Sequence, residues 1–137
     1  MQQKIKGDDK TTYDFPRGRG GDIVKVRFRA NRYADNGTLA ITMENRESWA
    51  GSDYWGPYGV LTVNIPDYSD RLAGNTQAFV DINKFGPGIV AWLEKHGIAT
   101  CTSIMCPSGH CMYPLMEFDE DFVASHATRE YLEYASE

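Results

Sequence analysis

The chain has 137 residues, of which 42% are hydrophobic and 12% aromatic, and this is enough to fill one hydrophobic core. Its longest apolar runs are five or six residues, and a membrane-spanning helix needs roughly 20, so the sequence excludes an integral membrane protein of the helical type. The net charge is −5, and the first ten residues, MQQKIKGDDK, lack the apolar stretch of a secretory signal, so we expect a cytoplasmic protein.

The charge is unevenly distributed along the chain. Residues 1–33 carry a net charge of +5 and residues 34–137 a net charge of −10. This division predicts a basic edge on an acidic body, which would attract basic surfaces to most of the exterior and anionic ones to a single patch. The alternative is that the two parts face each other and neutralise.

The N-terminal segment, residues 1–21, is predicted to be flexible or loop-like and basic, because Pro16 and the run RGRGG that follows it are costly to order. The remainder, residues 22–137, is predicted to be a single α+β domain. Residues 23–29 alternate apolar and basic side chains, which predicts a strand with one apolar and one basic face. Asp35-Asn36-Gly37 is typical of a tight turn, so residues 23–44 are predicted to form a hairpin.

Later elements follow from the same periodicities. Residues 45–57 are predicted to be a polar loop that contains three aromatic side chains, and residues 58–66 and 78–82 to be strands. A helix is expected from Gly86-Pro87-Gly88 to Gly97, then a strand over residues 110–118 and an acidic helix from Asp119. The predicted fold is a single antiparallel sheet of four to five strands with one or two helices packed on it.

Catalytic and metal sites are poorly supported by the sequence. Cys101, Cys106, His110 and Cys111 are nominally a zinc set, but their spacing does not match known zinc motifs, and we expect no metal and no cofactor. The odd number of cysteines favours reduced thiols that act as small buried hydrophobic side chains. A Cys111 nucleophile would need His96, His110 or His126 beside it, and Asp81 could serve as a buried base. We expect neither, and we predict that the protein is not an enzyme.

Binding residues are better candidates, and they fall into three sets. Aromatic side chains in a loop suit a contact surface or a lid on the core, acidic ones can compete with nucleic acid for a basic groove, and a basic strand face can contact phosphates. The aromatic set is Trp49, Tyr54 and Trp55; the acidic set is Glu117, Asp119, Glu120 and Asp121; the basic patch is Arg17, Arg19, Lys25, Arg27 and Arg29.

An ordered series of short segments carries a family resemblance. The segments are Thr62-Val63-Asn64-Ile65-Pro66, then Phe79 or Val80 followed by Asp81 and Asn83, then Ser108-Gly109 through Tyr113-Pro114-Leu115. Over about residues 23–118 the chain resembles the domain-of-unknown-function 4313 family of small bacterial proteins. His110 stands where the family pattern has an aromatic residue, and Cys101 and Cys106 do not belong to the pattern.

The resemblance implies a genomic setting rather than a chemistry. Such proteins are associated with phages, plasmids and conjugative elements, which carry many small acidic inhibitors of host defence. We therefore expect a non-enzymatic binding protein of a mobile element. Its partner would be a macromolecular protein, for example a nucleic-acid-handling complex such as a CRISPR effector, blocked through the acidic and aromatic residues. The alternatives are a small nucleic-acid-binding accessory protein that uses the basic strand, and an enzyme with a Cys/His site.

Overall fold

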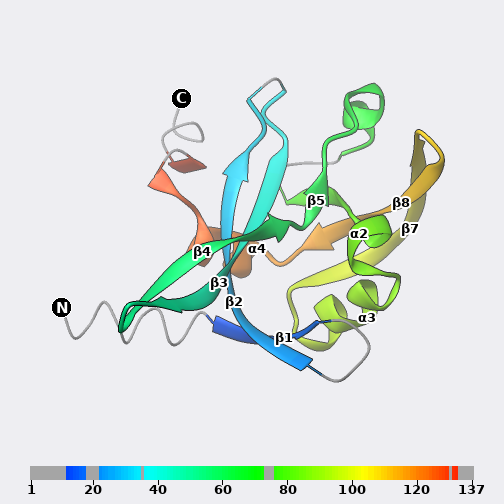
Figure 1. The fold of residues 1–137 in the computed structure, drawn as a ribbon. Helices are drawn as coiled ribbons and strands as arrows, with labels where there is room; N and C mark the ends of the chain where they lie inside the picture. The colour runs from blue at the N-terminus through cyan, green and yellow to red at the C-terminus, as the bar shows by residue number, and fades with distance from the viewer. Residues whose placement is uncertain (1–11, 18–21, 35, 73–75, 130, 133–137) are drawn as a thin grey trace.

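The computed structural model describes residues 12–17, 22–34, 36–72, 76–129 and 131–132. Within these ranges the chain forms two antiparallel four-stranded sheets, with helices packed beside them (Figure 1). The first sheet has the order β1-β2-β3-β4 and the second the order β5-β6-β8-β7. The strands are β1 Thr12–Arg17, β2 Asp22–Arg32, β3 Leu39–Trp49, β4 Ser52–Val60, β5 Thr62–Val63, β6 Gln77–Val80, β7 Ala99–Ser108 and β8 Cys111–Phe118. The helices are the 3-10 helix η1 Pro66–Arg71 and the α-helices α2 Ile82–Phe85, α3 Gly88–Lys95 and α4 Glu120–His126.

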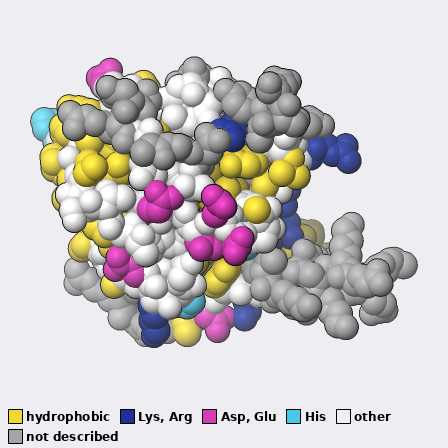
Figure 2. Space-filling model, turned by 180° about the vertical axis from the view of Figure 1, so that it is seen from behind, with side chains coloured by type: hydrophobic (Ala, Val, Ile, Leu, Met, Phe, Trp, Pro, Cys, Tyr) yellow, Lys and Arg dark blue, Asp and Glu magenta, His cyan; other side chains and the backbone are white. Residues whose placement is uncertain are grey.

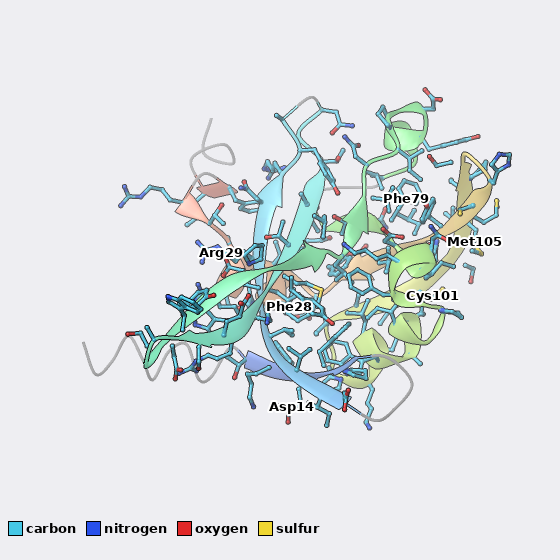
Figure 3. All side chains as sticks on the ribbon, viewed as in Figure 1. Asp14, Phe28, Arg29, Phe79, Cys101 and Met105 are labelled. Atoms are coloured by element: carbon cyan, nitrogen blue, oxygen red, sulfur yellow. The ribbon has the colours of Figure 1, made fainter. Side chains whose placement is uncertain are left out.

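The predicted hairpin of residues 23–44 is confirmed by β2 and β3. The two strands pair antiparallel, with Phe28 opposite Met43, and Gly37 supplies the positive φ of 72° that the turn requires. Both apolar side chains point to the core, whereas Arg29 points to the other side of the strand (Figure 3). The predicted two-faced strand is therefore present.

Two sequence-based predictions about the first sheet are wrong. Residues 45–57 are not a loop: β3 continues to Trp49, and β4 begins at Ser52 after the two-residue turn Ala50-Gly51. This outer part of the hairpin lies beyond the last β2–β3 pair, so both of its faces carry polar residues and the apolar alternation is missing. The N-terminal segment is not loop-like over Thr12–Arg17, which form β1; its other residues lie outside the described ranges.

The prediction of a single sheet is also wrong, although the α+β class is confirmed. At the end of β4 the chain turns through Leu61, whose N–H donates to the carbonyl of Ile41 on β3. The next strand, β5, then pairs with β6 rather than continuing the first sheet. Thr62 completes this junction, because its hydroxyl oxygen accepts from the Ile41 N–H (3.1 Å) and lies 2.9 Å from the Tyr33 hydroxyl.

The main core fills the space between the two sheets and the helices. It takes Phe28 from the first sheet, Met116 and Phe118 from the second, and Leu93 and Phe122 from the helices. A smaller core covers the opposite face of the second sheet; it consists of Ile65, Phe79, Cys106, Tyr113 and Leu115. The second sheet is thus apolar on both faces, which is why its strands do not alternate cleanly.

The helices follow the predicted signals. The helix α3 begins after Gly86-Pro87 and is followed by Gly97, whose φ is 69°. The helix α4 begins after Asp119, which accepts a hydrogen bond from the Phe122 N–H (3.0 Å). Among the helices that the structure describes, none has the length and apolar character needed to cross a membrane.

Candidate interaction surfaces

The outer face of the first sheet carries the described part of the predicted basic patch, and most of its cations are paired. Lys25 contacts Asp14 at 2.7 Å. Arg27 contacts Glu44 at 2.6 Å. Arg29 is exposed and forms no ion pair with any described residue. The Arg17 side chain and all of Arg19 lie outside the described residues.

Acidic neighbours therefore compensate much of the positive charge of this face. The pairs arise because strand register places Asp14 opposite Lys25 and Glu44 opposite Arg27. The Lys25–Asp14 pair is exposed, whereas the Arg27–Glu44 pair is partly buried. An exposed pair contributes about 0–1 kcal/mol to stability, so the main effect of Lys25–Asp14 is on the surface potential. Of the two charge arrangements that the sequence left open, local neutralisation applies to this face, and the acids come mainly from neighbouring strands.

The aromatic set occupies the β3–β4 hairpin, where its members differ in availability. Trp49 is 76% exposed and lies beside the turn, and Tyr54 is 46% exposed. Trp55 is half-buried, because the guanidinium groups of Arg27 and Arg46 lie 4.6 and 5.5 Å from its ring centre. Trp49 is thus the freest anchor, and Trp55 belongs to the charged outer face.

The hydroxyl of Tyr54 is held by its cross-strand neighbour. It donates a hydrogen bond to the Glu47 carboxylate at 3.0 Å. That hydrogen bond, and then the negative charge of Glu47, raise the pKa of Tyr54 above its usual value. Gly56 makes room for the carboxylate, since a Cβ there would lie 2.3 Å from Glu47 Oε2. The arrangement fixes the direction of an exposed aromatic ring.

The acidic set lies where β8 ends and α4 begins, and Figure 2 shows acidic side chains gathered on this side of the molecule. Glu117 accepts hydrogen bonds from Thr76 and Gln77, and Asp119 caps α4. The remaining two members, Glu120 and Asp121, are exposed in the first turn of α4. Within the described part of the chain, none of the four carboxylates forms an ion pair.

Sequence reasoning missed several charged residues that the fold adds to these surfaces. Glu94 Oε2 accepts a hydrogen bond from the Cys101 N–H (3.1 Å). Cys101 follows Thr100, which lies opposite Glu117 in the β7–β8 pair. Glu94 therefore extends the acidic set across one strand. On the outer face, Arg46 contacts Asp53 at 3.6 Å. Neither addition was visible in the sequence, because both depend on strand pairing.

The acidic and aromatic sets come from separate elements. Among the described residues, no hydrogen bond, ion pair or ring contact joins the β3–β4 hairpin aromatics to the carboxylates of β8 and α4. They are therefore two candidate surfaces rather than a single acidic and aromatic surface.

The cysteines and histidines are scattered. Cys101 is exposed, Cys106 buried and Cys111 half-buried, and all three are free thiols. Burial, followed by the neighbouring Cys111 thiol, raises the pKa of Tyr113. Asp81, the other residue considered for catalysis, caps α2 by accepting from the Lys84 N–H (3.0 Å).

The histidines lie against aromatic rings or in a turn. His96 stacks on Trp92 and His126 on Phe122, each with 4.2 Å between ring centres. His110 is exposed in the β7–β8 turn. A search of the described residues finds no group of three His, Cys, Asp or Glu side chains placed to hold a metal ion.

Comparison with known proteins identifies the family. No curated protein and no solved structure matches the chain. Residues 28–136 match the family described as Domain of unknown function (DUF4313). This range covers β2 from Phe28 onward and every later element of the fold. The chain belongs to the DUF4313 family.

Proposed function

We propose that this protein is a non-enzymatic binding protein of a phage, plasmid or conjugative element, and that it acts in the bacterial cytoplasm. Its role is to inhibit a nucleic-acid-handling complex of the host, of which a CRISPR effector is an example. The surface that contacts the complex is the acidic set at the start of α4, with Trp49 on the hairpin as a second contact.

The observation that carries the proposal is the difference in charge compensation between the two charged surfaces. Two of the three cations of the basic patch whose side chains are described, Lys25 and Arg27, have acidic partners in Asp14 and Glu44. The four carboxylates beside α4 have no cationic partner among the described residues, and two of them, Glu117 and Asp119, accept hydrogen bonds from described donors. Negative charge therefore remains available for a basic groove, which is the surface that a nucleic-acid-handling complex presents to its substrate.

The test is an interference assay with a charge-reversed variant. Cells that carry a CRISPR effector directed against a plasmid are transformed with that plasmid, with and without the protein. We expect the native protein to restore transformation and the variant E120K/D121K to lose this effect. Both residues are exposed and hold no described hydrogen bond through their side chains, so the variant is expected to fold.

The matched control is D22K/D67K, which changes the net charge equally at two exposed acids outside the acidic set. It should restore transformation as the native protein does. Equal activity of E120K/D121K and the native protein would contradict the proposed surface. Equal loss in both double variants would show that only the overall charge matters, which contradicts it as well.

Direct binding of nucleic acid through the basic strand is the second candidate. The observation that favours it is the stacking of Arg27 and Arg46 on Trp55. Arg29 lies on the same face and forms no ion pair with any described residue. It requires a mobility shift with single-stranded DNA or RNA at low salt that weakens as salt rises, and that R29E removes. Absence of any such shift would rule it out.

A further inference from the structure

A cavity of about 650 Å³ lies between β1, α2 and the start of α3. Its volume falls within the range of roughly 300–1,000 Å³ that is typical of small-molecule sites. The aromatic rings of Phe15, Phe85 and Trp92 and the side chain of Ile89 form its apolar wall. None of these residues belongs to the acidic, aromatic or basic sets described above.

The wall is rigid because its rings support one another. Phe15 is 3% exposed, and its ring meets those of Trp92 and Phe85 edge-on, with centres 4.9 and 5.9 Å apart. Such edge-to-face pairs hold aromatic side chains in fixed orientations. The cavity therefore has a preformed apolar wall.

Among the described residues that line the cavity, Lys84 is the one with a cationic side chain. Lys84 is exposed, its Nζ lies 5.5 Å from the centre of the Phe85 ring, and it forms no ion pair with any residue the structure describes. The backbone of β4 positions this side chain, since a Cβ on Gly59 would lie 3.0 Å from Nζ and 3.3 Å from the Phe85 ring. A lysine held at the edge of an apolar site, with no described acidic partner, favours an anionic group on a ligand.

The other polar groups at the cavity are the side chain of Asn83 and the backbone groups of the Gly86-Pro87-Gly88 segment. Pro87 has no N–H and offers no side-chain cap to α3. A Cβ at Gly88 would meet nothing within 4 Å, so this side of the cavity is open to a ligand. None of the lining residues that the structure describes carries a carboxylate.

We propose that this cavity binds a small organic anion with an aromatic body, the ring lying against Phe15, Phe85 and Trp92 and the anionic group contacting Lys84. This site goes beyond the proposed inhibitory function and does not depend on it. It predicts selectivity for aryl carboxylates or sulfonates over uncharged molecules of the same shape.

The test uses two fluorescent probes that share an aromatic body and differ in charge. Anilinonaphthalene sulfonate is anionic, and phenylnaphthylamine is its uncharged counterpart. We expect one sulfonate site per chain in the folded protein. The variant K84Q should weaken sulfonate binding by about twofold to fivefold, the range expected for losing one ion pair at an exposed site. It should leave binding of the uncharged probe unchanged.

A matched control is K95Q, which removes an exposed lysine at the far end of α3 and should change neither affinity. The variant M105Q/M112Q removes exposed apolar side chains of the β7–β8 hairpin and should also have no effect. In the W49F/W55F background Trp92 is the remaining tryptophan, and bound sulfonate should quench it.

Two results would overturn the proposal. One is sulfonate binding that M105Q/M112Q abolishes and K84Q leaves intact, since the dye would then sit on the hairpin. The other is the absence of binding to the folded protein, with fluorescence rising only when denaturant is added. Circular dichroism of each variant confirms that the native fold is retained.

Discussion

Removal of one hydroxyl at the junction of the two sheets should lower stability measurably. Thr62 is 4% exposed, and its Oγ1 accepts from the N–H of Ile41, which is itself fully buried. The substitution Thr62→Val keeps the shape of the side chain but leaves that N–H without its acceptor. A buried donor without a partner costs about 1–3 kcal/mol. We therefore expect the free energy of unfolding to fall by about 2 kcal/mol, the middle of that range.

Urea denaturation followed by far-ultraviolet circular dichroism measures this loss. A decrease of about 2 kcal/mol corresponds to a shift of about 1 M in the midpoint for a domain of this size. The control Thr62→Ser retains the hydroxyl and removes one methyl group, so it should cost about 1 kcal/mol. The reasoning is refuted if Thr62→Val stays within about 0.5 kcal/mol of the native protein, or if Thr62→Ser costs more than Thr62→Val.

Three further predictions concern the hairpin turn, a tyrosine and the thiols. Ala50 has a φ of 53°, a value that asparagine adopts more readily than alanine. The substitution Ala50→Asn, which creates an Asn-Gly turn, should therefore raise the free energy of unfolding by about 0.5 kcal/mol. Urea denaturation measures the change, and a decrease would contradict the turn geometry. Because Glu47 favours the neutral form of Tyr54 and so raises its pKa, Glu47→Gln should let Tyr54 ionise at lower pH in an ultraviolet titration, with Y54F as the control. The exposed Cys101 should react with an aromatic disulfide reagent in the folded protein, whereas the buried Cys106 should react only as the protein unfolds. Peptide mapping measures the two rates, and equal rates would contradict this difference in burial.

The elements with strong local signals could be predicted from the sequence. The alternation around Phe28, the Asn36-Gly37 turn and the Gly-Pro-Gly start of α3 each depend on interactions within a few residues. Such interactions are determined by neighbouring side chains and by the φ values that glycine and proline allow. For this reason, the positions of the β2–β3 hairpin, α3 and α4 are confirmed, whereas η1 and α2 are not predicted and the sheet arrangement differs.

What the sequence could not provide was the partner of each strand. The segment around Ser52 has polar residues on both faces, which is the pattern of a loop. This polarity arises because the β3–β4 hairpin extends past β2. Likewise, β7 contains Thr102, Ser103 and Pro107, which are typical of turns, yet it pairs with β8 through an irregular register. Both strands depend on long-range pairing, which periodicity does not encode.

The candidate surfaces were predicted to different extents for the same reason. The acidic set is contiguous in sequence and stays together at the β8–α4 junction. The basic patch is also confined to one stretch of the chain, residues 17–29. The acids that compensate its positive charge come from other strands, as Glu44 does for Arg27. Charge counted along the chain therefore overstates the basic character of residues 22–34. For the acidic set, the charge counted along the chain agrees with the negative charge that the folded structure exposes.

This difference in compensation predicts where a basic ligand binds. In a nuclear magnetic resonance titration with a lysine- and arginine-rich peptide, shifts should concentrate on residues 117–121, because those carboxylates have no described cationic partner. The amides of Asp14 and Glu44 should change little, since Lys25 and Arg27 already occupy their carboxylates. Raising the salt concentration from about 0.1 M to 1 M shortens the screening length from about 10 Å to about 3 Å and should remove the shifts. Shifts centred on Asp14 and Glu44 instead would show that these ion pairs open in solution, and the argument from compensation would then fail.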